Sequence, residues 1–217
     1  MKLISSLGPN PRGIRMFMLE KNITLPTEEV DILTAENRTG PYAKKNPGAQ
    51  MPSLELEDGQ VIAETVPIYE YLEEKYPTPA LIGATPEERG EARMWQRRIE
   101  LKVTEHIYCA FRYGPGLEMY SARQTCFPDM LDGLKGQIKI GMEWLDGLLG
   151  DNEFLCGSRL TYADIILFAA LDFAHGVELV PDASISNILR WFEGMNSRPT
   201  ATASLHEAGT AGGFRGV

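Results

Sequence analysis

The stretch Asn46-Pro-Gly-Ala-Gln-Met-Pro-Ser-Leu-Glu-Leu-Glu-Asp-Gly-Gln-Val-Ile-Ala-Glu-Thr65 decides the fold. Two short runs, 53–57 and 60–63, flank the pair Asp58-Gly59. An Asp-Gly pair readily adopts the positive φ values that a tight turn between two strands requires. The sequence therefore predicts a β-hairpin at this point of the chain.

The dipeptide Met51-Pro52 stands immediately before the first strand of this hairpin. Proline within a sheet is restricted to strand starts, edges and bulges. A cis peptide bond here would turn the peptide of residue 51 outward, toward a ligand. The alternative is an ordinary trans proline that opens an edge strand.

Glu64-Thr65 follows the hairpin and begins an apolar-faced segment that extends to about Tyr76. Thr65 is the expected N-cap, and Pro67 is tolerated in the first turn of a helix. The free N–H groups and the dipole at this end favour an anion, such as the carboxylate of a peptide-like ligand. The alternative is a plain helix cap beside a surface glutamate.

The chain before the hairpin predicts strand, helix and strand. Residues 2–6 form a short, partly apolar run, the turn 8–11 follows it, and 12–21 has apolar residues at helical spacing. Residues 27–32 alternate as in a strand, and a long polar loop, 34–50, leads to the hairpin. Because a connection of this length is unusual, it is expected to be functional.

The composition of the sequence changes after Tyr76. Prolines and glycines from 77 to 86 indicate a linker, and no strand is predicted beyond it. Amphipathic or apolar helical segments follow, at 87–113, 129–149, 162–175 and 185–195. An α/β domain is thus followed by an all-α domain.

Composition and net charge limit the classes of function that the chain is expected to have. The 217 residues are 43% hydrophobic and 24% charged, as in ordinary globular proteins, and the net charge of −9 disfavours nucleic acid and anionic membranes. The longest apolar run, Ile165–Leu171, is too short to span a bilayer, and residues 1–10 do not form a secretory signal. Three widely spaced cysteines and three scattered histidines predict a cytoplasmic protein without a disulfide framework or a metal site.

The order β-α-β-loop-Pro-β-β-(Glu-Thr)-α, followed by helices only, resembles the glutathione transferase family. Three segments carry the resemblance: 46–54, 63–72 and Gly157-Ser-Arg-Leu-Thr-Tyr-Ala-Asp-Ile-Ile166. In the third, Thr161 as N-cap and Asp164 at N3 predict a capping box, which is a folding device. The resemblance implies a thioredoxin-like glutathione-binding domain at 1–78, a linker at 79–88 and an all-helical domain at 89–217.

The same resemblance implies how the cosubstrate glutathione binds. The main chain of Met51, before Pro52, would pair with its cysteinyl part. Glu64 and Thr65 would hold the γ-glutamyl end. Gln50 would reach the glycyl end, whose carboxylate Lys44 or Lys45 would neutralise, although adjacent lysines in a loop are often simply solvated.

A transferase of this kind needs a hydrogen-bond donor for the cysteinyl sulfur, because a free thiol is only a few per cent ionised at neutral pH. Gly8 occupies the position where many relatives carry Ser or Cys. Asn10, whose turn resembles that of a bacterial subgroup, is the first choice for the donor, and Ser5 and Ser6 are the second. Alternatively, Asn10 only caps the first helix. Arg12 would add positive potential or lie exposed on the surface.

The acceptor pocket is expected on the first long helix of the second domain, with Tyr108 and Arg112 as its principal residues. Three functions stay open: conjugation of glutathione to a small electrophilic or hydrophobic substrate, glutathione-dependent reduction of peroxides or disulfides, and non-catalytic binding. Gly8 favours the last. Family dimers imply a homodimer in which the first domain of one subunit faces the helices of the other.

Overall fold

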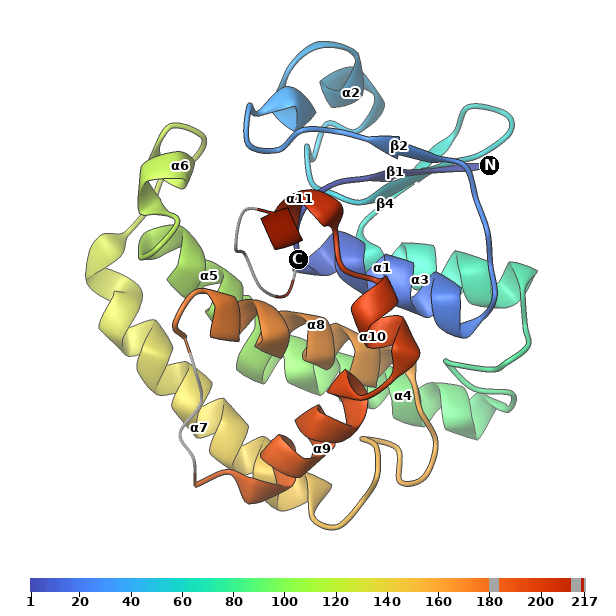
Figure 1. Ribbon diagram of the computed structural model, residues 1–217, viewed down its shortest axis with the longest axis vertical. Coiled ribbons are helices and arrows are strands. Elements are labelled where there is room, and N and C mark those ends of the chain that lie inside the picture. Colours follow the sequence, from blue (N-terminus) through green and yellow to red (C-terminus); the bar gives the residue numbers. More distant parts are fainter. Residues whose placement is uncertain (180–183, 212–215, 217) are drawn as a thin grey trace.

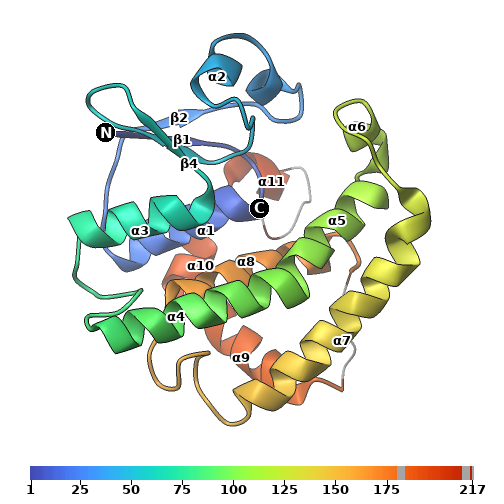
Figure 2. The ribbon, with the colours of Figure 1, turned by 180° about the vertical axis from the view of Figure 1, so that it is seen from behind.

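A computed structural model of the chain describes residues 1–179, 184–211 and 216. The sheet lies at one end of the molecule, and a group of long helices fills the other (Figure 1). Figure 2 shows from behind that α3 and α1 separate the sheet from the long helices. The predicted division into an α/β part followed by a helical part is confirmed.

Four strands form the sheet: β1 (Lys2–Ser5), β2 (Thr27–Glu29), β3 (Ser53–Glu55) and β4 (Val61–Ala63). Their order is β2-β1-β3-β4, with β1 parallel to β2 and β3 antiparallel to both of its neighbours. The hairpin turns at Gly59, which has a φ of 85°. Strand β2 is shorter than the predicted 27–32; it pairs with β1 alone at the edge of the sheet, and all three of its residues are exposed.

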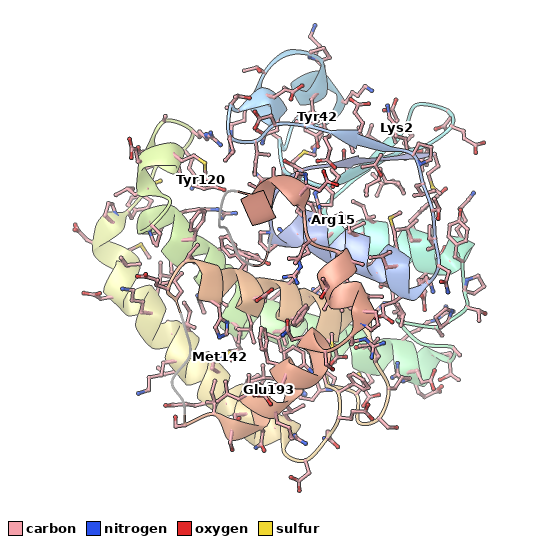
Figure 3. All side chains as sticks on the ribbon, viewed as in Figure 1. Lys2, Arg15, Tyr42, Tyr120, Met142 and Glu193 are labelled. Carbon is pink, nitrogen blue, oxygen red and sulfur yellow. The ribbon has the colours of Figure 1, made fainter. Side chains whose placement is uncertain are left out.

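Both faces of the sheet are covered because successive side chains of β1 point in opposite directions. Leu3 joins the main core, which also contains residues of α1 (Pro9–Glu20) and α3 (Thr65–Lys75). Ile4 packs on the other side with Val30 and with Tyr42 of α2 (Gly40–Lys45), a short helix that follows the 3-10 turn η1 (Glu36–Arg38). Tyr42 stands between α2 and the strands in Figure 3.

The start of α3 differs by one residue from the prediction. The N-cap is Glu64, at φ 69°, rather than Thr65, which is the first helical residue. Since no side-chain bond caps this end, several of its N–H groups remain available to a ligand.

The predicted helix 87–113 is continuous but changes its winding. It consists of α4 (Pro86–Ile99), the π-helical turn η2 (Glu100–Thr104) and α5 (Glu105–Tyr113). Helix α7 (Leu131–Leu149) crosses this turn at Gly141, where an added Cβ would lie 2.0 Å from the carbonyl oxygen of Lys102. Glycine therefore permits the close approach, and the π turn lies at the crossing point.

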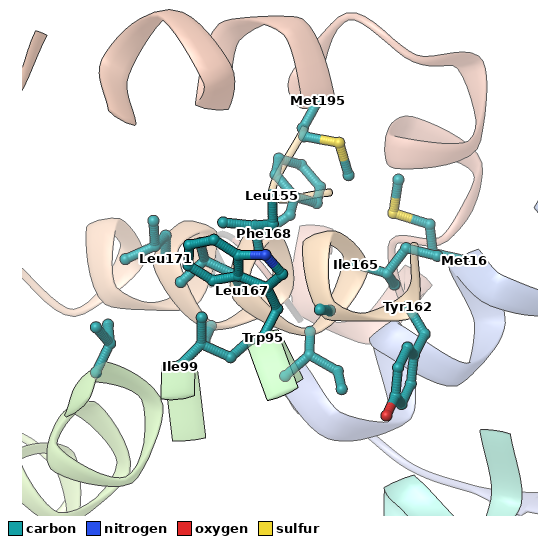
Figure 4. Close-up of a cluster of buried hydrophobic side chains, with 14 of the residues drawn as sticks. Met16, Trp95, Ile99, Leu155, Tyr162, Ile165, Leu167, Phe168, Leu171 and Met195 are labelled. Carbon is teal, nitrogen blue, oxygen red and sulfur yellow. The ribbon is translucent and has the colours of Figure 1, made fainter. Parts of the chain in front are cut away.

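Helix α8 (Tyr162–Gly176) is the centre of the helical part and is buried along nearly its whole length. Figure 4 shows its side chains packed against Trp95 and Ile99 of α4, Met16 of α1 and Met195 of α9 (Ser186–Asn196). The predicted capping box is present: Asp164 Oδ2 accepts from the Thr161 N–H at 3.0 Å and from its hydroxyl at 2.9 Å. Asp164 Oδ1 accepts from Leu155 N–H and Trp191 Nε1, which supports a purely structural role.

Short elements complete the helical part: α6 (Leu117–Ser121), η3 (Pro128–Met130), α10 (Pro199–Ala203) and α11 (Glu207–Ala211). Helix α11 lies near the first turn of α1 in both views (Figures 1 and 2). In the described part of the chain, none of the helices combines the length and the apolar character needed to cross a bilayer.

Candidate active site

A cleft of about 530 Å³ opens between the two parts of the molecule. Five segments line it: 7–11 at the start of α1, 32–38 before α2, 50–51 before β3, 108–123 on α5 and α6, and 173–178 at the end of α8. One wall thus comes from the α/β part and the other from the helices. Of the residues expected at the site, Asn10, Gln50, Met51, Tyr108 and Arg112 all line this cleft.

Asn10 lies at the second position of α1, and its side chain contacts the helical wall. Its Oδ1 accepts a hydrogen bond from the hydroxyl of Tyr108 at 3.1 Å. Its Nδ2 donates to no described residue. Helix α1 begins after Gly8 without any side-chain cap, so the alternative reading of Asn10 as a helix cap is wrong.

Tyr108 is nearly buried, with 9% of its surface exposed. Burial, together with the nearby carboxylate of Glu105, raises the pKa of Tyr108 well above its ordinary value. The phenol therefore stays protonated and remains a donor to Asn10 at neutral pH. The Asn10 oxygen accepts the hydrogen bond from this phenol. The N–H₂ group of Asn10 is therefore left to donate to a ligand.

Ser5 and Ser6 are buried and do not line the cleft. Ser5 Oγ accepts from Arg15 at 3.3 Å, and Ser6 Oγ donates to the carbonyl of Val30 at 2.6 Å. Both hydroxyls therefore serve the packing of β1. Arg12, which was expected to supply potential or lie exposed, is 1% exposed and binds Asp172 of α8 at 2.6 Å.

The Met51-Pro52 peptide bond is cis. The carbonyl of Gln50, just before it, accepts hydrogen bonds from the hydroxyl of Tyr42 and from Asn46 Nδ2, both at 2.9 Å. By contrast, the N–H and C=O of Met51 bond to no described residue. A strand-like ligand segment can therefore pair with the main chain of Met51.

Glu64 and Thr65 stand beside this point without being among the cleft-lining residues. Strand register explains their place: Ser53 pairs with Ala63, so Pro52 and Glu64 are neighbours at one end of the hairpin. An added Cβ on Gly48 would be 3.9 Å from Glu64 Oε1, which shows that the carboxylate points toward the 48–51 loop.

The expected lysines lie elsewhere. Lys44 and Lys45 are exposed on α2 and do not line the cleft, and Lys45 pairs with Glu55 at 2.8 Å. Instead, Arg38 lines the cleft as Gln50 does, and its Nε is buried without a hydrogen-bond partner among the described residues. The sequence analysis missed Arg38, although it lies in the long loop that was expected to be functional.

The helical wall is aromatic and basic. The ring of Phe111 packs edge-on against Phe173 of α8, with 4.9 Å between centroids, and against Tyr120 of α6, with 5.9 Å. Arg112 lies over the Tyr120 ring at 5.8 Å. Tyr120 is labelled on α6 in Figure 3.

Arg123, also missed, spans the mouth of the cleft. Its two terminal nitrogens donate to the carbonyls of Ile32 and Leu33 at 2.7 and 2.8 Å, joining the helical wall to the opposite one. Both carbonyls belong to the segment between β2 and η1, about ninety residues away in the sequence.

The cysteines lie away from the cleft. All three cysteines are free, and none of them lines it. Burial, aided by Glu91 and Asp164, raises the pKa of Cys156 to about 11, so this thiol stays protonated at neutral pH. The described residues contain no cluster of His, Cys, Asp or Glu suited to a metal ion.

Comparisons with known proteins agree with this geometry. The models of the glutathione S-transferase N-terminal and C-terminal domains match residues 7–75 and 106–199. Glutathione S-transferase 2 of Saccharomyces cerevisiae is 30% identical over 207 residues, which is 91% of this chain and 86% of the yeast protein. The expected resemblance is therefore confirmed at the level of sequence.

Solved structures show the same fold. The crystal structure of Gtt2 from Saccharomyces cerevisiae aligns with a TM-score of 0.88 and 28% identity, covering 94% of this chain and all of the yeast chain. A glutathione S-transferase domain-containing protein from Marinobacter aquaeolei aligns with a TM-score of 0.84 and 33% identity, covering 93% of this chain and all of that one. The chain therefore belongs to the glutathione S-transferase family and is a glutathione-dependent transferase, with a thioredoxin-like first domain and glutathione as its cosubstrate.

Proposed function

We propose that this enzyme conjugates the thiol of glutathione to a small electrophilic or hydrophobic substrate, with Asn10 as the residue that stabilises the thiolate. The observation that carries the proposal is the hydrogen bond from Tyr108 to Asn10 Oδ1, at 3.1 Å. It fixes the amide so that Nδ2 is free to donate toward the cleft.

Chemically, an amide donor suits this task. The N–H₂ group binds a thiolate without transferring a proton, and it stabilises the charged form in a partly dry site. Lowering the thiol pKa by one unit requires about 1.4 kcal/mol of preferential stabilisation. The thiol proton passes to solvent, and the thiolate forms the S–C bond as the leaving group of the electrophile, chloride in the case of an aryl chloride, departs with the electron pair of its bond to carbon.

The glutathione backbone binds along the first domain. Its cysteinyl main chain pairs with Met51, next to Pro52. The N–H and C=O groups of Met51 both lack described partners. The γ-glutamyl end lies at Glu64 and Thr65, at the uncapped start of α3. We assign the glycyl carboxylate to Arg38 with Gln50, because Arg38 lines the cleft whereas Lys44 does not.

We further propose that the enzyme is a cytoplasmic homodimer. Free cysteines suit a reducing compartment. Apolar side chains more than 40% exposed on α4 and α7 and in η2, Met94, Leu101, Ile140 and Leu148, support burial against a second copy. Light scattering at two protein concentrations gives the mass in solution, and a strictly monomeric mass removes the dimer.

The Asn10→Ala variant tests the role of Asn10. Its kcat for a model electrophile such as 1-chloro-2,4-dinitrobenzene should fall about 100-fold, as when one oxyanion donor is removed. Glutathione binding, measured by calorimetry, should change little, because the main chain and Glu64 carry it. The Asn10→Asp variant keeps the acceptor for Tyr108 but places a negative charge by the sulfur, so it should be at least as impaired.

Asn152→Ala, an exposed position outside the cleft, is the matched control. Unchanged turnover in Asn10→Ala would remove Asn10 from the mechanism while leaving the family assignment intact. Absence of glutathione binding by the wild-type protein would instead favour the non-catalytic function.

Reduction of peroxides or disulfides is the other enzymatic candidate. Routes in which a protein cysteine forms a mixed disulfide at the cleft are disfavoured, because none of the three cysteines lines it. Assays with a hydroperoxide and with a glutathione mixed disulfide, beside the electrophile, rank the activities directly.

A further inference from the structure

The cleft collects positive charge in a chain whose overall charge is negative. Among the residues that the structure describes, three arginines line it, Arg38, Arg112 and Arg123, against one carboxylate, Glu178. The whole chain carries a formal net charge of −9. The charge of the cleft is opposite in sign to that of the whole chain. It therefore favours the binding of an anion and does not simply follow the general charge of the surface.

The three arginines are not equivalent. Arg123 uses both terminal nitrogens to hold the carbonyls of Ile32 and Leu33. Arg38 lines the cleft, as Gln50 does, on the wall assigned above to glutathione. Only Arg112 is both on the acceptor wall and without a hydrogen bond or an ion pair to any described residue.

The surroundings of Arg112 leave its charge unneutralised. Its one described interaction is with the face of the Tyr120 ring, 5.8 Å away. The titratable groups that line the cleft with it are the phenols of Tyr108, which stays protonated, and Tyr120, the carboxylate of Glu178 and the guanidinium groups of Arg38 and Arg123, while Glu105 and Arg112 act on Tyr108 with opposite signs. Arg112 is half-buried, and neither of these carboxylates forms an ion pair with it within 4.0 Å, so its guanidinium is available to a ligand.

The same wall also provides flat apolar surfaces. Phe111, Tyr120 and Phe173 form a chain of edge-on ring contacts beside Arg112. Rings of this kind bind planar conjugated groups, and a guanidinium beside them matches a carboxylate with two parallel hydrogen bonds. The two features together select a ligand that is planar at one end and anionic at the other.

We propose that the acceptor of this enzyme is a planar, unsaturated or aromatic electrophile that carries a carboxylate, and that Arg112 binds this carboxylate. The proposal rests on the proposed conjugation and specifies its substrate class. Arg112 is then a specificity residue: it holds the group remote from the reacting carbon while Asn10 holds the sulfur.

A matched pair of acceptors tests the proposal: 4-chloro-3-nitrobenzoate and its methyl ester. In both reactions the glutathione sulfur forms a bond to the ring carbon, chloride leaves with the electron pair of the C–Cl bond, and the thiol proton goes to solvent. The readout is the ratio of kcat/KM for the acid to kcat/KM for the ester. Dividing the ratio of a variant by that of the wild type cancels the intrinsic reactivities of the two compounds.

The Arg112→Gln variant should lower this ratio about tenfold or more, because a hydrogen bond to a charged group is lost. Arg112→Lys, which keeps a charge but not the planar fork, should fall between the two. The control is Arg97→Gln on α4, whose side chain is 64% exposed, and it should leave the ratio unchanged. Thermal melting of each variant confirms that the fold is retained.

Each outcome is decisive. An equal loss for acid and ester in Arg112→Gln overturns the proposal, and so does a rise in the KM for glutathione alone, which would assign Arg112 to the peptide. Both results leave conjugation itself standing. If the wild type conjugates 1-chloro-2,4-dinitrobenzene but turns over neither benzoate compound, this inference is overturned and the proposed conjugation stands; absence of turnover with all three compounds overturns both.

Discussion

In the first domain, the groups proposed to bind glutathione come from main chain and from residues close together in the sequence. Met51 offers both peptide groups, and Glu64 follows it across one hairpin, brought near by the pairing of Ser53 with Ala63. On the helical wall, the groups are side chains of α5, α6 and α8, and their positions depend on helix packing. Arg112 and Phe173, for example, are brought together only by the fold.

This difference predicts a division of labour. A wall built from main chain changes little when side chains are exchanged, so it suits a ligand that is constant, such as glutathione. A wall built from side chains can be altered residue by residue, so it suits an acceptor that differs between relatives. Tyr108 connects the two walls, and Arg12 connects the two parts of the molecule that carry them, which gives ways to test the division.

The largest expected effect is a loss of stability on substitution of Arg12, whose side chain joins the α/β part of the molecule to the helical part. Its side chain is 2% exposed and binds Asp172 at 2.6 Å and the carbonyl of Ala201 at 3.1 Å. Arg12→Met should lower the free energy of unfolding by about 3–5 kcal/mol, because the Asp172 carboxylate stays buried without the guanidinium. Urea denaturation measures the change.

A surface ion pair provides the control for Arg12. Arg97 pairs with Glu100 at 3.2 Å and is well exposed, so Arg97→Met should change the free energy of unfolding by less than about 1 kcal/mol. If Arg12→Met were equally mild, the buried ion pair would not be what holds the two parts of the molecule together.

A smaller effect, on the KM for glutathione alone, is expected from substitution of Glu64 in the first domain. Glu64→Gln removes the charge that we propose to face the amino group of the γ-glutamyl end, while it keeps the size of the side chain. The KM for glutathione should rise about tenfold, whereas kcat and the KM for the acceptor should change little. Steady-state kinetics with each substrate varied in turn separate these constants.

Glu57→Gln is the matched control, since Glu57 lies in the same hairpin and its side chain is 88% exposed. A change in acceptor KM as large as that in glutathione KM would contradict the division between the walls. Equal effects of the two variants on glutathione would remove Glu64 from the binding site.

The features that the sequence predicted correctly rest on local signals. The turn at Asp58-Gly59 and the capping box of Thr161 and Asp164 each involve residues at most three apart. Their geometry is determined by backbone preferences that act in any context. The order of strands and helices followed from such signals, and the comparisons with known proteins confirm the resulting fold.

What the sequence did not predict depends on contacts between distant segments. Arginine is usually exposed, so nothing local marks Arg12 as buried against a residue 160 positions away. Arg38 and Arg123 face the cleft only because a loop and a helix meet there. The π turn at 100–104 lies where Gly141 of another helix packs closely against it.

The smallest expected effect is a change in kcat on loss of the hydrogen bond between Tyr108 and Asn10, which are 98 residues apart. This bond joins the two walls, so it compares them most directly. In Tyr108→Phe the amide of Asn10 loses the donor that fixes its orientation, so kcat should fall about threefold to tenfold. The effect should be constant from about pH 6 to about pH 9, because the raised pKa of Tyr108 keeps the phenol protonated throughout.

A double-mutant cycle decides how Tyr108 acts. If it only positions Asn10, Tyr108→Phe should have no further effect on kcat in the Asn10→Ala background. The same fold-loss in both backgrounds would instead make Tyr108 a direct contact of the sulfur or the acceptor. Tyr113→Phe is the control, because Tyr113 packs against Phe127 outside the cleft and should leave kcat unchanged in either background.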